Sequence, residues 1–325
     1  MNGKTTHRIS FGLEKYSSVS ASADGRHLVA TEASQNPALW SVPILPNRVA
    51  EERDANPYPV GTVRALGPRF GGKSLFYLSS RGTGDALWRF QDGQSTEIWK
   101  GSDGALLEPP AVSPDGRSVA IALRRNGKLT LHLATAEGNE LRPFAESIDV
   151  SGAADWSRDG QWIVTGGTDA HGLGVFKIRV NGGMPVRLTT GQGSNPVWVA
   201  GGRPDRIYRR ERGLLRARVG CSPGWYSGKT TPIEVLREGV RVRFLHNGSG
   251  FVYMQGLPSA QTLWMFDLET MKTRQLTRLD NAGTMRSFDI SPEGEIVFDR
   301  LRGNSHVVLI DLPGDPSPID SQSSH

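Results

Sequence analysis

Three features of the sequence predict an all-β chain built from one repeated sheet. Short apolar runs alternate with polar residues, as in QWIVT at 161–165. Asp-Gly or Asn-Gly turns bound these runs, which is typical of antiparallel hairpins. A turn glycine recurs every 42–47 residues, within the period of about 40–50 residues expected for a four-stranded propeller blade. The sequence therefore predicts a β-propeller of seven blades, each with four antiparallel strands, and six regular blades as the alternative. The seven glycines are Gly25, Gly72, Gly116, Gly160, Gly202, Gly248 and Gly294.

The clearest copy of the unit spans residues 155–190. A Ser-Arg-Asp-Gly turn at 157–160 leads into the first alternating run, and a glycine-rich break separates it from a second run at 175–180. A tight turn at 181–183 then leads into a third short strand. One such sheet cannot bury both of its faces alone, so it needs neighbouring copies packed against it.

The first and last units each contain only three expected strands. In the first unit these lie near 17–19, 27–31 and 39–42, and the last unit covers 286–312. Residues 8–11, RISF, are expected to supply the missing outer strand of the last blade. This pairing would join the two ends of the chain and remove exposed sheet edges.

The repeat motifs resemble a known family. The SPDG turn, strands ending in LWMFDL or VVLIDL, and the closing RQLT or VRLT resemble the TolB-type, WD-like β-propeller repeat. More narrowly, the chain looks like the propellers attached to bacterial transmembrane Ser/Thr kinases or winged-helix regulators. The resemblance runs from about Tyr16 to Pro313 and predicts one propeller domain over 1–313 with a disordered tail at 314–325. It implies a binding or sensor module in bacterial signalling that recognises a protein, peptide or cell-envelope ligand.

Composition narrows the class of protein. No apolar run approaches the roughly 18 residues that span a membrane, and no secretory signal is visible at the N-terminus. As written, the chain is expected in the cytoplasm, or outside the membrane if it is detached from a membrane-anchored parent. We expect a protein or peptide partner, no nucleic acid, no cofactor and a monomer.

Residues 199–235 interrupt the repeat. Seven arginines lie between Arg203 and Arg218, which could form a basic nucleic-acid patch. The preferred hypothesis is a frameshifted segment, because codons can be chosen so that a neighbouring frame reads as an ordinary blade. This hypothesis predicts a disrupted blade whose strands are short or absent, and the nucleotide sequence would test it.

Residues 67–74, GPRFGGKS, match the phosphate-binding pattern GxxxxGK[ST]. That motif needs a helix directly after it, so that backbone amides point at the phosphate. Here a β-strand run follows, and the glycines are in register with the turns of other blades. We therefore predict a structural turn.

The sequence gives no sign of a catalytic or metal site. There is no GxSxG nucleophile elbow, and the seven histidines have no metal-ligand spacing. The aspartates of the repeat turns are expected to bond local backbone, and tryptophans shared between copies to pack between blades. The competing class is a propeller hydrolase or lyase acting at the channel mouth.

Propellers most often bind ligands at the mouth of the central channel. Polar residues in otherwise apolar first strands are therefore the candidate ligand-binding positions, although they could instead bond neighbouring blades or channel water. These residues are Glu108, Asp149, Asp155, Asn195, Arg286 and Asp289.

Overall fold

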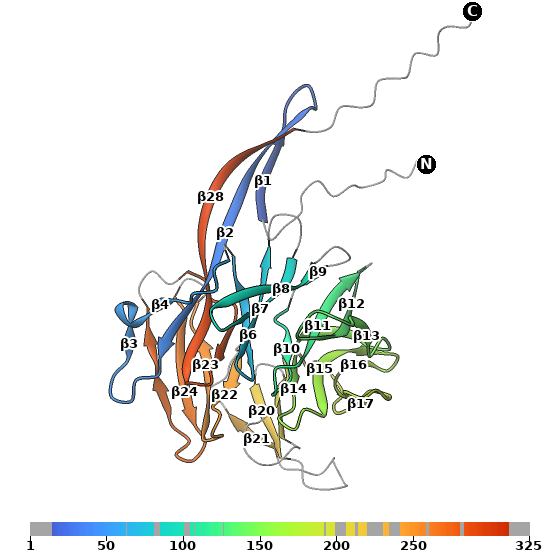
Figure 1. Cartoon of the computed structure of the whole chain (residues 1–325), viewed down its shortest axis with the longest axis vertical. Coiled ribbons are helices and arrows are strands. Elements are labelled where there is room, and N and C mark those ends of the chain that lie inside the picture. Colours follow the sequence, from blue (N-terminus) through green and yellow to red (C-terminus); the bar gives the residue numbers. More distant parts are fainter. Residues whose placement is uncertain are drawn as a thin grey trace, which may run out of the picture. The chain divides into compact units, whose positions relative to one another are not determined.

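The computed structural model describes most of the chain between Lys15 and Asp311 (Figure 1). The described residues are 15–62, 64–80, 85–100, 105–106, 108–125, 127–191, 193–198, 206–211, 214–219, 230–233, 241–257, 260–279 and 283–311. The chain divides into two compact units. The larger is residues 1–12 and 37–302, and the smaller is residues 13–36 and 303–325.

The first three sheets of the larger unit follow one another along the chain, and each is an antiparallel meander. The first consists of β5 (Leu66–Gly71), β6 (Ser74–Ser80), β7 (Asp85–Gln91) and β8 (Gln94–Lys100). The second consists of β10 (Ala111–Val112), β11 (Ser118–Arg125), β12 (Lys128–Thr135) and β13 (Arg142–Phe144), with β9 (Ala105–Leu106) also paired to β11. The third consists of β14 (Asp149–Trp156), β15 (Trp162–Asp169), β16 (Gly172–Arg179) and β17 (Val186–Arg187).

Two further meanders complete the run. One consists of β18 (Val197–Trp198), β19 (Arg206–Glu211), β20 (Leu214–Val219) and β21 (Thr230–Ile233). The other consists of β22 (Val242–Phe244), β23 (Gly250–Gln255), β24 (Thr262–Asp267) and β25 (Thr273–Gln275). Each strand pairs with the next in sequence, as the turn spacing predicts.

The sixth sheet combines the two ends of the chain. Its order is β27 (Phe288–Ile290), β28 (Glu295–Asp311), β2 (His27–Pro43) and β4 (Asn56–Pro57), and β1 (Lys15–Ala21) also pairs with β2. A small parallel sheet of β3 (Ala50–Glu51) and β26 (Thr277–Arg278) and the 3-10 helix η1 (Glu52–Asp54) complete the described elements.

The described residues therefore form six sheets of four or five strands, not the seven predicted. The expected strands at 27–31 and 39–42 are one continuous strand, β2, so the first predicted unit is not a separate blade. Instead, β2 supplies the third strand of the sheet that β27 and β28 begin. The predicted closing strand at 8–11 and the tail at 314–325 lie outside the described residues.

The smaller unit is a β ribbon. In it β1 pairs with the first half of β2 from Lys15 opposite Ala33 to Ala21 opposite Leu28, with a register shift after Tyr16. His27 of β2 lies 3.5 Å from the carboxylate of Asp311 at the end of β28.

Residues 199–235, in which strands were expected to be short or absent, contain three strands in their described part. In the described part of 199–235, β19 and β20 are six residues each and pair along their whole length, and β21 pairs with β20. The described part of this segment is therefore in strands, and the disrupted blade and its frameshift origin stay predictions that the nucleotide sequence tests.

The phosphate-loop match is a hairpin turn, as predicted. Gly71 pairs with Ser74, and the two-residue turn between them leads directly into β6. Gly72 has a φ of +56°, which a glycine adopts without the Cβ penalty of other residues. Because a strand and no helix follows, the backbone amides of a phosphate loop are not assembled here.

The Ser-x-Asp-Gly turns are held by their own side chains, as predicted. In the turn at 157–160, the Ser157 hydroxyl donates to Asp159 Oδ1 at 2.6 Å and accepts from the Trp162 amide at 2.9 Å. Asp159 also accepts from the Gln161 amide at 3.0 Å. The turn containing Ser113 and Asp115 repeats the same bonds. These aspartates therefore fix the start of each second strand.

The first strands of successive sheets lie next to one another around a common centre. Contacts join β27 to β5, β5 to β10, β10 to β14, β14 to β18, and β22 to β27. The apolar faces of adjacent sheets pack together behind this inner layer. One such core cluster includes Leu131, Phe144, Ile148, Ile163 and Phe176, from the second and third sheets. This arrangement is that of a β-propeller, and it places one strand of each sheet at the centre.

Candidate functional site

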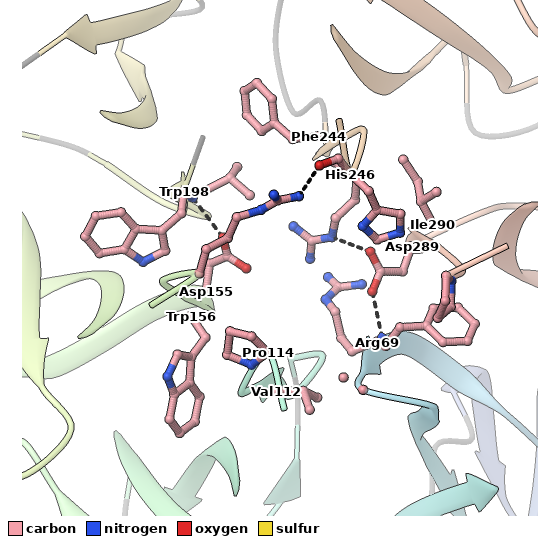
Figure 2. A pocket seen from close by; sticks show the side chains of 17 residues that line it. Arg69, Val112, Pro114, Asp155, Trp156, Trp198, Phe244, His246, Asp289 and Ile290 are labelled. Atoms are coloured by element: carbon pink, nitrogen blue, oxygen red, sulfur yellow. Dashed lines mark hydrogen bonds and ion pairs between the residues drawn. The ribbon is translucent and has the colours of Figure 1, made fainter. Parts of the chain in front are cut away.

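A central cavity with a volume of about 560 Å³ is surrounded by residues from all six sheets. This volume lies within the range of about 300–1,000 Å³ typical of small-ligand sites. Figure 2 shows Asp155, Arg69 and Asp289 converging on the same space, with the indoles of Trp156 and Trp198 beside it. The residues contributed by the first strands and the turns after them are Arg69, Phe70, Gly71, Gly72, Val112, Pro114, Asp155, Trp156, Arg158, Val197, Trp198, Arg243, Phe244, His246, Asp289, Ile290 and Pro292.

One repeat position supplies four of the charged groups of this cavity. In each sheet, one residue of the first strand lies opposite the middle of the second strand. Examples are Asp155 opposite Val164, Arg243 opposite Val252 and Asp289 opposite Val297. In the order of the sheets along the chain, this position is held by Arg69, Ala111, Asp155, Val197, Arg243 and Asp289. Two arginines and two aspartates at this position therefore line the cavity, whereas the other two sheets have Ala111 and Val197 at this position.

Asp289 connects the last sheet to the first. Its Oδ2 accepts a hydrogen bond from the Phe70 backbone amide at 2.8 Å, and its Oδ1 lies 3.4 Å from Arg243 Nε. Both charged side chains are 14% exposed. Because little water reaches the pair, the attraction between the two charges is weakly screened.

Asp155 makes the equivalent connection between the third and fourth sheets. Its Oδ2 accepts from the Trp198 backbone amide at 2.8 Å. Burial raises the pKa of the Asp155 carboxyl, whereas Arg243 and the bond from Trp198 oppose this shift. The same position of two sheets thus carries an aspartate that binds the backbone of the next sheet.

Arg69 is a buried cation at the cavity, with 5% of its surface exposed. Its Nη1 donates to the Ser287 hydroxyl and the Phe288 carbonyl, both at 3.0 Å. Burial, and then the nearby Arg243, lower the pKa of the Arg69 guanidinium. Among the described residues, Arg69 Nε has no hydrogen-bond partner.

Two turns form part of the cavity rim. Arg158 Nη2 donates to the His246 carbonyl at 2.6 Å, which links the third and fifth sheets. His246 Nε2 lies 3.0 Å from the Ser291 carbonyl, so the Nε2–H tautomer donates to it. These bonds hold the rim residues in place.

Two of the six predicted site residues, Asp155 and Asp289, line the cavity. The other four lie outside its lining: Asp149 accepts from the Leu129 amide at 3.0 Å, and Asn195 Oδ1 accepts from the Ala153 amide at 2.7 Å. Glu108 lies 3.4 Å from Arg241, and the Arg286 backbone amide donates to Asp299 at 2.6 Å. Bonding between neighbouring sheets, the alternative role, is thus observed for Asp149, Asp155 and Asp289.

Sequence reasoning missed Arg69, Arg158, Arg243 and His246. Arg243 was detectable, because it precedes its turn glycine by five residues as Asp155 and Asp289 do. Arg69 precedes Gly72 by only three, since its hairpin turn is shorter. A search limited to polar residues upstream of long turns therefore passes over it.

The shared tryptophans only partly match their expected role. Trp156 and Trp198 belong to apolar clusters between neighbouring sheets, as predicted, but both also line the cavity. Trp88 is 3% exposed and packs in the core. His132 is buried in β12 and burial lowers its pKa, which fits the predicted structural position.

The fold and the cavity together define the class: a β-propeller with a ligand-sized site at its centre. Comparison with protein-family models and with curated proteins gave no match. Among solved structures, the chain is similar to a putative TolB from Agrobacterium tumefaciens, with a TM-score of 0.63 and 18% identity over 83% of this chain and 99% of that one. It is also similar to TolB from Acinetobacter baumannii, with a TM-score of 0.55 and 15% identity over 82% of this chain and 65% of that one.

An enzyme is also among the similar structures. A puromycin hydrolase variant in complex with PGG has a TM-score of 0.51 and 15% identity, over 86% of this chain and 47% of the hydrolase chain. At these identities the comparisons establish a TolB-like β-propeller fold. The kinase and winged-helix resemblance expected from the sequence is not shown.

The described residues contain no group of three or more His, Cys, Asp and Glu side chains placed to hold a metal ion. Nor do they contain a helix with the length and apolar character required to cross a membrane.

Proposed function

We propose that the chain is a non-catalytic binding propeller that recognises a protein or peptide ligand in its central cavity, as a sensor or recognition module in bacterial signalling. The observation that carries this proposal is the cavity itself, which is lined by residues of all six sheets and contains both charged and aromatic groups. A rigid scaffold that presents converging side chains suits recognition without any chemistry of its own.

The hydrogen bonds of the cavity favour binding over catalysis. Asp155 and Asp289 each use an oxygen to bind the backbone of the next sheet, and His246 uses Nε2 for the Ser291 carbonyl. Groups held in this way keep fixed positions, which is the preorganisation that a binding site needs. A general base, in contrast, must be able to exchange its proton with a substrate.

The alternative is a propeller hydrolase or lyase that uses the same cavity. One observation favours it: burial raises the pKa of Asp155, and perturbed carboxyls inside clefts are candidates for acid or base catalysis. The bond from the Trp198 amide stabilises the ionised form instead, so the binding role is preferred.

Affinity selection tests the proposal. A library of random N-acetyl hexapeptides is passed over the immobilised protein, and retained peptides are identified by mass spectrometry. Val112→Trp places an indole in the cavity, whereas Val186→Trp adds the same ring on the outer strand β17, where Val186 is 44% exposed. We expect Val112→Trp to weaken binding of the retained peptides about tenfold or more, and Val186→Trp to leave it unchanged.

Three other results would contradict the proposal. These are retention of no peptide, equal retention by both tryptophan variants, or the release of cleaved peptides. Cleavage that Asp155→Asn abolishes would instead support the hydrolase.

A further inference from the structure

The two aspartates of the central cavity have different neighbours at their shared repeat position. In the order of the sheets, Asp289 lies between Arg243 and Arg69, and its Oδ1 is 3.4 Å from Arg243 Nε. The corresponding neighbours of Asp155, in the second and fourth sheets, are Ala111 and Val197. One carboxylate is therefore flanked by cations, whereas the other is flanked by small or apolar side chains.

Asp155 keeps one carboxylate oxygen without a hydrogen-bond partner. Its Oδ2 accepts from the Trp198 amide at 2.8 Å, and within the described part of the chain no hydrogen bond or ion pair reaches its Oδ1. The residue is only partly buried, and Figure 2 shows its carboxylate directed into the cavity. A carboxylate oxygen in a site with little water is expected to find a donor. Oδ1 is therefore an open acceptor on the cavity lining.

The group that binds at this oxygen should carry no net charge. Arg69, Arg243, Asp155 and Asp289 balance one another in charge, and both arginines are close enough to act electrostatically on Asp155. An ammonium group would add a cation beside these arginines, and a carboxylate would add an anion beside two aspartates. Either would leave an uncompensated charge where water has little access. A neutral O–H or N–H group satisfies Oδ1 and keeps the balance.

The accessible surface beside Asp155 is apolar. Val112 and Pro114 belong to the second sheet, whose first strand contacts that of the third sheet. Both residues line the cavity, where Val112 is partly exposed and Pro114 is exposed. The cavity volume of about 560 Å³ has room for a whole aromatic side chain. A group held at Oδ1 therefore meets an acceptor and an apolar wall together.

We propose that the cavity binds an uncharged aromatic side chain that carries a hydrogen-bond donor, that of tyrosine or tryptophan, with Asp155 Oδ1 as its acceptor; this rests on the proposed function. These two side chains combine a large apolar ring with one polar group, and a bond to an ionised acceptor is stronger than one between neutral groups. Phenylalanine offers the ring alone and would leave Oδ1 desolvated and unpaired. The site should therefore distinguish tyrosine from phenylalanine.

The first test is the composition of the hexapeptides that the immobilised protein retains. We expect enrichment of tyrosine or tryptophan over phenylalanine, leucine and the charged residues. Retained peptides without this enrichment would overturn the inference but leave the proposed function standing. Retention of no peptide would overturn both.

The second test compares matched peptides on the wild-type protein. In a retained peptide, tyrosine is replaced by phenylalanine, or tryptophan by benzothienylalanine, in which sulfur takes the place of the N–H. Each replacement removes the donor and keeps the ring, and we expect it to weaken binding about tenfold or more. Equal affinities within a matched pair would overturn the inference, and this outcome does not depend on the folding of any variant.

A variant then assigns the acceptor. The amide oxygen of Asp155→Asn can still accept from the Trp198 amide, so the variant replaces an ionised acceptor by a neutral amide. We expect it to reduce the affinity difference within each matched pair at least about threefold. Asp267→Asn is the control, because Asp267 lies in an exposed turn outside the cavity lining, and it should leave the difference unchanged. A full difference in a folded Asp155→Asn protein would overturn the assignment to Asp155.

Discussion

At the scale of single residues, two glycines of the repeat turn occupy the same backbone conformation in different surroundings. Gly116 has a φ of +73° and Gly160 a φ of +72°. A Cβ on Gly116 would overlap the Gly71 carbonyl oxygen of the neighbouring sheet, whereas a Cβ on Gly160 would meet no atom within 4 Å. Any other residue would be strained in the left-handed conformation at either position, but only Gly116 also lies in a close contact between sheets.

This difference predicts unequal effects of the same substitution. Gly160→Ala should lower the free energy of unfolding by about 1 kcal/mol, the strain of the conformation. Gly116→Ala should lower it by about 2–4 kcal/mol, because overpacking is added to that strain. Urea denaturation of both variants measures the difference, and equal losses would contradict the close packing at Gly71.

The raised pKa of the half-buried Asp155 carboxyl predicts a pH dependence of stability. Because its pKa is raised in the folded protein, the folded state binds more protons than the unfolded state between the two pKa values. Its stabilising contribution is therefore complete below the unfolded pKa of about 4 and is lost as the pH rises through the folded value. The free energy of unfolding of the wild type, relative to that of Asp155→Asn, should therefore fall as the pH rises from about 3 towards neutrality.

Asp115 supplies a control of opposite sign. The Ser113 hydroxyl, and then the Arg117 amide, lower the pKa of Asp115. The contribution of Asp115 to stability is present above its unfolded pKa and is lost on acidification. The free energy of unfolding of the wild type, relative to that of Asp115→Asn, should therefore rise with pH. Chemical denaturation across this pH range measures both differences. A flat or rising curve for Asp155 would contradict its burial.

At the scale of strands, the sequence predicts most of the architecture, because the period of the turns and the alternation within strands are local properties. The hairpin at Gly71–Ser74 and the turns at Ser113 and Ser157 follow from residues within a few positions of each other. The number of sheets is harder to predict from the sequence. Whether residues 27–43 form two strands or one depends on pairing with β28, more than 250 residues away in the chain.

The site was only partly predictable for a related reason. Asp155 and Asp289 stand out because a carboxylate is unusual in an inner strand. Arg69 and Arg243 occupy the same repeat position, but their convergence on one cavity follows only when the sheets surround a common centre. Asp149 and Asn195 carry the same polar signal, and their side chains bind backbone amides outside the cavity lining.

At the scale of the whole larger unit, contacts between distant parts of the chain hold the last sheet against the first. The buried carboxylate of Asp299, 1% exposed, accepts from the Gly67 amide at 3.0 Å and from the Arg286 and Ser287 amides at 2.6 and 2.8 Å. Gly67 and Asp299 are 232 residues apart. This single side chain therefore joins β5 to the segment that leads into β27.

Removing that carboxylate should destabilise the whole unit. Asp299→Ala leaves three amides without their acceptor where water has little access, and we expect a loss of about 3–5 kcal/mol in the free energy of unfolding. Asp267 provides the matched control, because it also accepts three bonds, from the Glu269 amide and from the amide and hydroxyl of Thr270, but in an exposed turn. Since water replaces those bonds, Asp267→Ala should cost about 1 kcal/mol or less. Urea denaturation monitored by tryptophan fluorescence measures both. A similar small loss for the two variants would mean that the contact between the first and last sheets contributes little, and that the sheets are held together mainly by their apolar faces.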